Sequence, residues 1–182
     1  YLPLWRKLAK GGVITFGKTS GADVHARHLR LNDSGCAEFM VRCSDELADC
    51  VLRVPGIQQV SNALAALAAA VAAGVRLDLA ARALRSFEGV ARRFSVKDVR
   101  GVTVIDDAYN ANPASFGAAL DTLMIMRSAR RFVIAGDMLE MGGAAEEQHL
   151  ELGRLLAGCN LAGLVTVGTL ASLAGAAAVG GG

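Results

Sequence analysis

Short apolar runs separated by turn-forming residues fill the first part of the chain, up to residue 54. Their bursts of alternating apolar and polar positions predict four strands, at residues 13–16, 24–31, 37–41 and 51–54. Asn, Asp, Ser and Gly at residues 32–35 predict an antiparallel hairpin between the second and third strands. Pro55 and Gly56 end this strand region.

An Ala- and Leu-rich stretch at residues 63–73 predicts a buried helix that ends at Gly74. A second helix is expected at residues 77–87, with most of its apolar side chains on one face. Asn62 directly precedes the first helix, and two interpretations are open for it. It caps the helix, or its amide contacts a ligand.

Strand and helix patterns alternate after residue 94, which predicts a parallel sheet with helices on its faces. The segment E-G-V-A-R-R-F at residues 88–94 lies before this alternation and is interpreted as an interdomain linker, with its two arginines either solvated or turned into the cleft. The Ala- and Gly-rich tail at residues 171–182 either frays or begins a further element. The predicted strands are at residues 95–99, 102–106, 131–135 and 161–167, and the predicted helices at 113–128 and 144–157.

A polar turn follows the strand at residues 102–106 and reads D-D-A-Y-N-A-N-P. Asn112 and Pro113 are typical of an N-cap and a first helical residue. In parallel sheets ligands bind at the carboxyl ends of strands, and a helix N-terminus there favours an anion. The turn is therefore a candidate ligand site, with a purely structural turn as the alternative.

A second polar turn, G-D-M-L-E-M-G-G, follows the strand at residues 131–135. It brings Asp137 and Glu140 to the sheet edge expected for the first turn. Glu146 and Glu147 complement the start of the next helix. His149 follows one helical turn later and is either structural or catalytic.

The composition is that of a globular protein, with 53% hydrophobic and 20% charged residues. The net charge of +2 and the scattered basic residues give no basic stripe, so nucleic-acid binding is not expected. Arg127, Arg130 and Arg131 are expected to close a helix C-terminus. Four cysteines without a C-x-x-C pair indicate free thiols, and no signal peptide or membrane span is predicted, so a cytoplasmic location is expected. The chain does not begin with Met, and we expect it to be a piece of a longer protein.

Four segments together resemble the Mur ligases, and within them the enzymes that add D-alanyl-D-alanine to UDP-N-acetylmuramoyl-tripeptide. They are G-x-x-x-x-x-N-A at residues 56–63, A-R-R-F at 91–94, D-D-A-Y-N-A-N-P at 106–113 and G-D-M-L-E-M-G at 136–142. The resemblance implies an α/β chain in which residues 1–92 are the end of a central ATPase domain. Residues 93–182 are then a truncated, Rossmann-like C-terminal domain with a mainly parallel sheet.

The resemblance also implies a chemistry. ATP phosphorylates the terminal carboxylate of the tripeptide, and the amine of D-alanyl-D-alanine attacks the acyl phosphate. Mg²⁺ and cationic side chains neutralise the charge of the transferring phosphoryl group. We expect a monomer with UDP-N-acetylmuramoyl-tripeptide and D-alanyl-D-alanine as partners, and none of its residues is expected to ligate a metal.

Site residues follow from the motifs by resemblance. Asn62 matches an amide that contacts adenine, and Arg93 an arginine that reaches the ATP phosphates. Asp107 matches the acid that holds the ribose hydroxyls. The nucleotide and the incoming amine are faced by Tyr109, Asn110 and Asn112, of which Asn110 is also expected to be catalytic with Arg93. The implied role of Asp137 and Glu140 is D-alanyl-D-alanine recognition.

Two departures from the family pattern stand out. Gln58 and Gln59 replace the His-Asn pair of G-x-H-N-x-x-N, and Gln cannot titrate. The second departure is the lack of a phosphate loop: residues 12–19 spell G-x-x-x-x-G-K-T, but the gap is apolar and no helix is predicted after Thr19, so we interpret the match as accidental. We therefore expect the chain alone not to catalyse ligation.

Two rival functions remain for comparison. A non-catalytic nucleotide- or ligand-binding module would use the same turns without turnover, and the Gln58-Gln59 pair favours it. A dinucleotide-dependent oxidoreductase would need G-x-G-x-x-G after a strand, which the sequence lacks.

Overall fold

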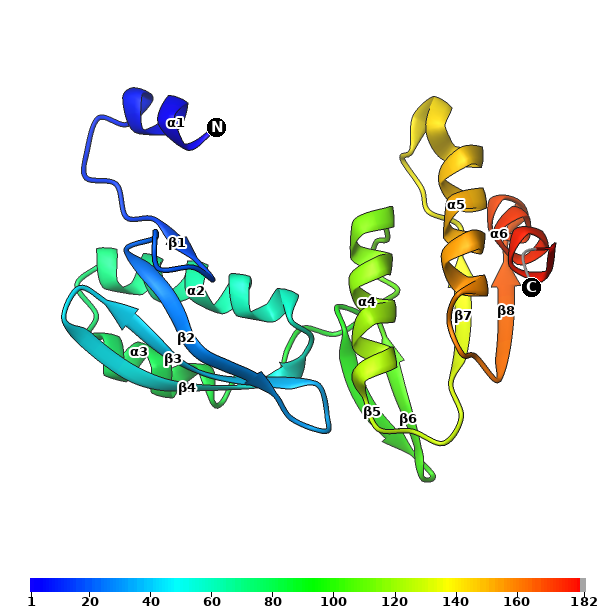
Figure 1. Ribbon diagram of the computed structural model, residues 1–182, viewed down its shortest axis with the longest axis horizontal. Coiled ribbons are helices and arrows are strands. Elements are labelled where there is room, and N and C mark those ends of the chain that lie inside the picture. The colour runs from blue at the N-terminus through cyan, green and yellow to red at the C-terminus, as the bar shows by residue number, and fades with distance from the viewer. Residues whose placement is uncertain (181–182) are drawn as a thin grey trace. The chain divides into compact units, whose positions relative to one another are not determined.

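The computed structural model describes residues 1–180 and divides the chain into two compact units, coloured blue to green and green to red in Figure 1. The first unit holds residues 1–32, 36–53 and 57–87, and the second holds residues 33–35, 54–56 and the chain from Glu88 onward. Both combine helices and strands, which confirms the α/β fold class. The domain boundary expected between residues 92 and 93 stays a prediction.

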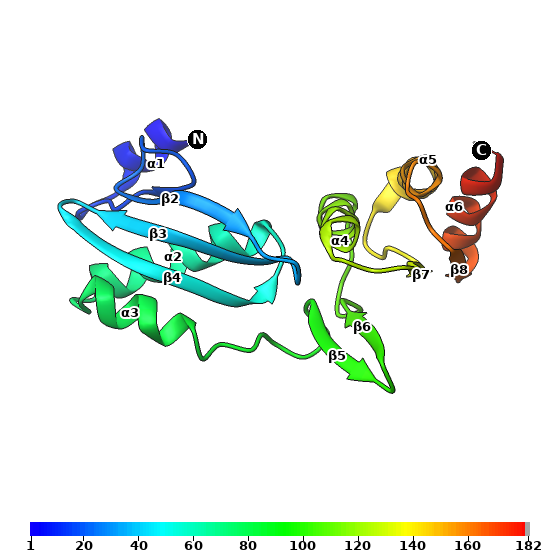
Figure 2. The same cartoon turned by 60° about the horizontal axis from the view of Figure 1, so that its bottom comes forward.

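The first unit is a four-stranded sheet with helices on one face (Figure 2). Its strands are hydrogen-bonded in the order β1-β2-β3-β4. The hairpin predicted around residues 32–35 is confirmed, since β2 and β3 pair antiparallel from Leu31 opposite Ala37 to Val24 opposite Cys43. The elements are α1 (Leu2–Leu8), β1 (Phe16–Gly17), β2 (Val24–Leu31), β3 (Cys36–Cys43), β4 (Glu46–Pro55), α2 (Gln58–Ala72) and α3 (Leu77–Leu84).

The first strand is shorter than predicted and pairs in parallel with β2 through Phe16 and Gly17 alone. Thr15, expected in this strand, instead bonds the Asp23 carboxylate through its backbone N–H at 2.8 Å and its hydroxyl at 2.7 Å. A bend and turn follow Gly17, and no helix begins after Thr19 before β2. The phosphate-loop match at residues 12–19 is therefore accidental, as interpreted.

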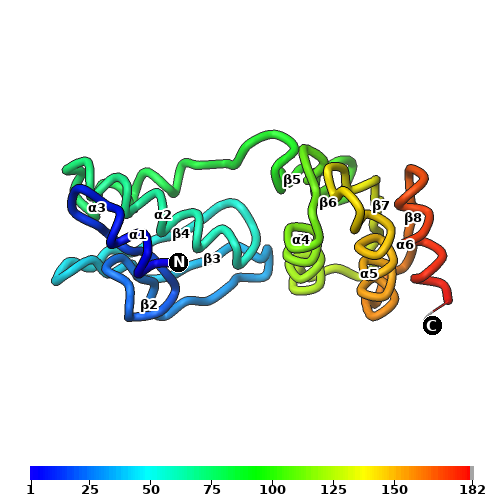
Figure 3. The backbone as a smooth tube through the Cα atoms, turned by 90° about the horizontal axis from the view of Figure 1, so that it is seen from above, coloured from blue at the N-terminus to red at the C-terminus, as the bar shows by residue number. Residues whose placement is uncertain are grey.

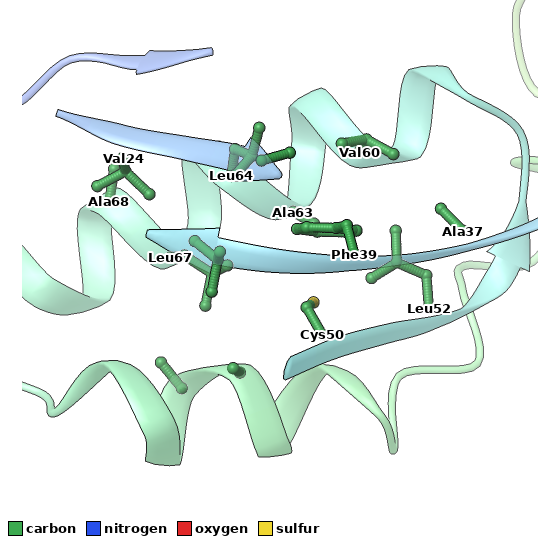
Figure 4. Packing of buried hydrophobic residues seen from close by; sticks show 14 of the residues in the cluster. Val24, Ala37, Phe39, Cys50, Leu52, Val60, Ala63, Leu64, Leu67 and Ala68 are labelled. Carbon is green, nitrogen blue, oxygen red and sulfur yellow. The ribbon is translucent and has the colours of Figure 1, made fainter. Parts of the chain in front are cut away.

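The core of this unit lies between one sheet face and α2 and α3, as Figure 4 shows in close-up. Val60, Leu64 and Leu67 recur at helical spacing along α2 and are almost fully buried against Val24 and Phe39 of the strands. Burying each large aliphatic side chain contributes about 1.5–3 kcal/mol. The predicted buried helix is thus confirmed.

Helix α2 begins five residues earlier than expected, at Gln58. Gly56 turns the chain out of β4 with φ +113°, a conformation open to glycine, and the helix starts from Ile57 without a side-chain cap. Asn62 therefore lies inside the helix and not at its start. The interpretation of Asn62 as the N-cap is wrong.

The second unit contains two separate strand pairs among its described residues. Strands β7 and β8 pair in parallel, as predicted, from Phe132 opposite Gly163 to Gly136 opposite Val167. Strands β5 and β6 instead form an antiparallel hairpin. The elements are β5 (Ser95–Val99), β6 (Val102–Asp106), α4 (Pro113–Ile125), β7 (Phe132–Gly136), a 3-10 turn (Gly142–Ala144), α5 (Ala145–Ala157), β8 (Gly163–Val167) and α6 (Thr169–Gly180).

The antiparallel pairing of β5 with β6 follows from the short turn that joins them. Arg100 and Gly101 have φ values of +55° and +82°, the two positive angles that a tight turn between antiparallel strands requires. The expectation of a mainly parallel sheet therefore holds for β7 and β8 and needs correction for β5 and β6.

The Ala- and Gly-rich tail forms a helix, α6, that packs along α5 (Figures 1 and 3). Gly153 of α5 makes this packing possible. A Cβ atom there would collide with the carbonyl oxygen of Ala174 and lie 2.6 Å from the Cβ of Ala177. The tail is thus a further element as far as Gly180, and residues 181–182 lie outside the described part.

Arg131 closes α4, as predicted for the arginine cluster. Its guanidinium donates hydrogen bonds to the last carbonyl groups around the helix end, those of Leu123, Met124 and Met126, at 3.0–3.2 Å. Neighbouring Arg130 stacks over the ring of Phe132 at 4.9 Å. Of the helices within residues 1–180, none combines the length and apolar character of a membrane span.

Candidate functional site

The first polar turn runs from the end of β6 into α4. Asn112 caps α4, because its Oδ1 accepts a hydrogen bond from the Ser115 N–H at 2.9 Å and Ser115 Oγ accepts one from the Asn112 N–H at 3.0 Å. This reciprocal capping box confirms the predicted helix start. The Oδ1 atom of Asn112 is engaged there, which leaves its Nδ2 group for a ligand.

Three hydrogen bonds fasten the A-R-R-F segment to the D-D-A-Y segment. The Phe94 N–H donates to Asp107 Oδ1 at 2.9 Å. Arg92 contributes the other two, donating from Nη2 to the Ala108 carbonyl at 2.9 Å and accepting from the Tyr109 N–H at 3.0 Å. Phe94 is buried beneath this junction, with 3% of its surface exposed. Two of the four segments singled out in the sequence thus form one structural unit.

Arg93 projects from this junction over the aromatic ring of Tyr109. Its guanidinium carbon lies 4.2 Å from the ring centroid, within the range of a cation–π interaction. Tyr109 is 61% exposed and Arg93 is exposed as well. The pair therefore offers solvent an oriented positive charge beside a flat apolar surface.

The half-buried carboxyl of Asp107 lies behind this pair. Burial raises the pKa of Asp107 above its ordinary value, the Phe94 N–H opposes the rise, the charge of Asp106 adds to it and that of Arg93 opposes it. One oxygen, Oδ1, is held by the Phe94 N–H. The other is the oxygen that can accept from a ligand hydroxyl.

Asn110 belongs to the same turn and is exposed. The structure therefore brings Arg93 and Tyr109 into direct contact and fastens Asp107 to Phe94, the residue after Arg93, with Asn110 and Asn112 in the same turn. Arg92 and Phe94 had no assigned role in the sequence. The A-R-R-F motif was the signal for them, but their contacts depend on a backbone geometry that the letters do not show.

The second polar turn is tied to α6. Asp137 Oδ1 accepts a hydrogen bond from the Ala171 N–H at 2.6 Å, in the first turn of α6. Gly168, which precedes this helix, has φ +117°, and a Cβ atom on it would overlap the Asp137 carboxylate. Asp137 thus caps a helix whose own preceding residue has no side chain.

Glu140 lies farther along this turn and is exposed. Its backbone has φ +64°, a left-handed conformation that non-glycine residues adopt infrequently. Within residues 1–180, no hydrogen bond or ion pair of the Glu140 carboxylate is observed. Its role in ligand recognition stays a prediction.

His149 is fully buried and supports the second polar turn through a hydrogen bond to its backbone. Its Nε2 accepts a hydrogen bond from the Met138 N–H at 2.9 Å, so Nδ1 carries the proton and donates to the Ala145 carbonyl at 2.7 Å. Both ring nitrogens are satisfied inside the protein. Of the two interpretations, the structural one describes this histidine.

Asn62 lies on α2 in the first unit and is exposed. Its Nδ2 donates to Gln59 Oε1 at 3.0 Å, one helical turn earlier. Gln58, the other residue of the substituted pair, has a buried Oε1 atom without a hydrogen-bond partner. The adenine contact expected for Asn62 stays a prediction.

The described residues contain no group of three or more His, Cys, Asp or Glu side chains that could hold a metal ion. Mg²⁺ in nucleotide enzymes is usually held by one or two carboxylates together with substrate phosphates, so such a cluster is not required. Asp106 and Asp107 are adjacent, but Asp107 Oδ1 and Asp106 Oδ1 already accept backbone N–H groups. One oxygen of each carboxylate is therefore engaged by the backbone.

Alternating strands and helices, with polar side chains in the turns that follow strands β6 and β7, make the second unit an α/β domain of the kind that binds ligands at its strand ends. Residues 92–180 match the family model described as "Mur ligase, glutamate ligase domain". A UDP-N-acetylmuramoyl-tripeptide–D-alanyl-D-alanine ligase of Mycobacterium tuberculosis is 35% identical over 170 residues, which cover 90% of this chain and 33% of that protein. The chain belongs to the Mur ligase family.

Solved structures agree with this assignment. The crystal structure of MurF from Acinetobacter baumannii superposes with a TM-score of 0.81 at 33% identity, covering 91% of this chain and 36% of that one. MurF from Thermotoga maritima in complex with ADP gives a TM-score of 0.77 at 27% identity, covering 94% and 40%. The chain spans about one third of the length of the curated D-alanyl-D-alanine ligases that it matches.

Proposed function

We propose that the chain is part of an ATP-dependent ligase that joins D-alanyl-D-alanine to UDP-N-acetylmuramoyl-tripeptide in peptidoglycan synthesis. The observation that carries this proposal is the Arg93–Tyr109 pair, an exposed cation held at a fixed junction of two family motifs. The named function of the similar ligases and the ADP complex of the Thermotoga maritima relative support it.

Each residue has a part in this reaction. Arg93 stabilises negative charge on the transferring phosphoryl group. The free oxygen of Asp107 accepts from the ribose hydroxyls, and the face of Tyr109 that is turned to solvent packs against the nucleotide. Asn110 and the Nδ2 group of Asn112 orient the reacting carboxylate and the incoming amine, with Asn110 the catalytic partner of Arg93.

The chemistry needs this arrangement because a carboxylate is a poor electrophile. Transfer of a phosphoryl group to the tripeptide carboxylate gives an acyl phosphate, whose phosphate the dipeptide amine then displaces. Mg²⁺, when bound with ATP, supplies further neutralisation of phosphate charge. In this proposal Glu140 contributes to D-alanyl-D-alanine recognition, and Asp137 does so only through the oxygen that does not cap α6.

Further parts of the proposal concern the whole protein. We place it in the cytoplasm, as a monomer without nucleic-acid partners. Residues 1–92 belong to the central ATP-binding domain, residues 93–182 to the C-terminal domain, and Asn62 contacts the adenine. The present chain is an incomplete piece that does not ligate by itself.

A second candidate is a non-catalytic nucleotide-binding module of the same fold. The Asn62–Gln59 hydrogen bond favours it, because the amide assigned to adenine is partly satisfied within its own helix. Gln58 and Gln59 also remove the titratable group of the usual His-Asn pair.

Phosphate release from ATP that requires both UDP-N-acetylmuramoyl-tripeptide and D-alanyl-D-alanine tests the two candidates. The protein is used in the length that its gene encodes. The ligase predicts such release, and a decrease of about 10²-fold or more in Arg93→Ala. Arg100→Ala is the matched control, because Arg100 is an exposed arginine outside the site. ADP binding without phosphate release would favour the module, and full activity in Arg93→Ala would remove the role of Arg93.

A further inference from the structure

We propose that Arg92 is a positioning residue, whose bond to the Ala108 carbonyl fixes the Arg93 guanidinium over the Tyr109 ring. The orientation of Arg93 by Arg92 can be tested without knowing the reaction, whereas the consequence of this orientation for catalysis rests on the proposed function.

The backbone around Arg93 gives the first argument. Arg92 and Phe94 have φ values of +63° and +53°, so left-handed residues stand on both sides of Arg93. Side chains with a Cβ atom adopt this region infrequently and keep it only where surrounding contacts hold it. Without such contacts the segment would relax, and Arg93 would point elsewhere.

The hydrogen bonds that hold the backbone around Arg93 come from the facing turn at residues 107–109. Arg92 bonds to Ala108 and Tyr109, and Phe94 bonds to Asp107, so the two left-handed residues are fastened to three consecutive residues of the facing turn. Besides its cation–π contact with Tyr109, Arg93 has one hydrogen bond recorded within residues 1–180, from its backbone N–H to the Val90 carbonyl at 3.0 Å. The orientation of Arg93 therefore depends on its neighbours more than on its own bonds.

The guanidinium groups of the adjacent Arg92 and Arg93 make different contacts. The Nη2 group of Arg92 is turned onto a carbonyl oxygen, whereas the Arg93 guanidinium has no hydrogen-bonded or ion-paired partner among the interactions recorded for residues 1–180. Arg93 is therefore the one available to an anion. A hydrogen bond from a charged donor to a carbonyl is directional, which suits Arg92 to a positioning role.

Nuclear magnetic resonance of the 182-residue chain tests the geometry without any nucleotide. The Tyr109 ring should shield the δ-methylene protons of Arg93, since the guanidinium carbon, two bonds from the δ carbon, lies over the ring face. Arg92→Met keeps the aliphatic stem and removes the donors, so this shielding should fall by half or more. Arg92→Lys keeps a donor and should restore part of it. Arg100→Met alters another exposed arginine with left-handed backbone, φ +55°, and should leave the shielding unchanged.

Undiminished shielding in Arg92→Met overturns the proposal, as does an equal loss in Arg92→Lys and Arg92→Met. The catalytic consequence is measured separately, as phosphate release by the gene-encoded protein. Arg92→Met should lower kcat about 10-fold with KM for D-alanyl-D-alanine unchanged, and Arg92→Lys should recover most of it. If the wild-type protein releases no phosphate while the shielding responds as expected, the proposed function fails and the positioning role of Arg92 stands.

Discussion

The carboxylate of Asp107 accepts a hydrogen bond from the backbone N–H of Phe94, with 2.9 Å between oxygen and nitrogen. This bond joins the segment before β5 to the end of β6 and pins the residue that follows Arg93. One oxygen of Asp107 therefore stabilises the backbone at Phe94, while the other oxygen remains for a ligand. A substitution that separates the charge from the hydrogen bond distinguishes these two tasks.

Asp107→Asn keeps an amide oxygen for the Phe94 N–H and removes the charge. Because the folded-state pKa of Asp107 is raised above 3.8, the native protein binds the proton more tightly than the unfolded chain, and stability falls as pH rises from 3.8 through the native pKa. The variant should lack this decline and be at least as stable as wild type at pH 7. Urea unfolding of both proteins at a series of pH values from about 3.5 to about 7, across the titration of a carboxyl group, measures this decline in the free energy of unfolding.

The matched control for this pH series is Asp121→Asn, an exposed carboxylate on α4. It should leave the decline in place. A steeper loss of stability with pH in Asp107→Asn than in wild type would contradict the assigned direction. In the ligation assay, Asp107→Asn should raise KM for ATP, because the amide replaces a charged acceptor for the ribose.

Asp137→Ala should destabilise the protein by about 1 kcal/mol, the usual loss on removing a helix cap. Asp137→Asn should retain most of that stability, since its oxygen can still accept from the Ala171 N–H. Thermal unfolding measures both. If the asparagine variant is stable but binds D-alanyl-D-alanine more weakly, the second oxygen contacts the dipeptide. Equal stability losses in both variants would show that the charge itself, and not the cap, is what α6 requires.

Gly153→Ala should destabilise the fold by about 2 kcal/mol, because the added methyl group overpacks the crossing with α6. Gly117→Ala is its control. Gly117 also lies inside a helix, but its Cβ position is open, so the same change should stabilise α4 by roughly 0.5–1 kcal/mol. Denaturant midpoints of the two variants should move in opposite directions. A neutral Gly153→Ala would mean that α5 and α6 are farther apart than described.

Cys50 should resist alkylation in the native protein. Burial raises its pKa to about 11, and the side chain is almost fully enclosed in the first core. At pH 8 the thiolate fraction is then on the order of one in a thousand, and the thiolate is the reactive form. Mass spectrometry after iodoacetamide treatment, with and without urea, should show Cys50 modified only on unfolding. Native labelling at the rate of an unfolded control peptide would contradict this.

Periodicity and turn residues were enough to predict most of the fold. The β2–β3 hairpin, the buried face of α2 and the parallel pairing of β7 with β8 all follow from local patterns. The start of α2 could not be predicted, because Ile57 is not a capping residue and the helix is set by the turn at Gly56 and by burial. Tertiary packing overrode the local signal there.

The candidate site was predictable only at the level of motifs. The strand-end position of D-D-A-Y-N-A-N-P follows from sequence, and so does the cap by Asn112. The contact between Arg93 and Tyr109 does not, since it depends on left-handed residues at 92 and 94 and on hydrogen bonds to a segment 13 to 16 residues away. For the same reason the sequence could not distinguish the tasks of Arg92 and Arg93.

The capping of α6 by Asp137 has a consequence for the order in which the second unit becomes structured. A helix of 12 residues is marginal in isolation, and α6 begins after a glycine that brings no cap of its own. Its stabilising carboxylate comes from the turn that follows β7, 34 residues earlier, and β7 itself pairs with β8, the strand before α6. We therefore expect α6 to be the last of these elements to gain protection in pulsed hydrogen exchange, and to lose it first when the turn is altered.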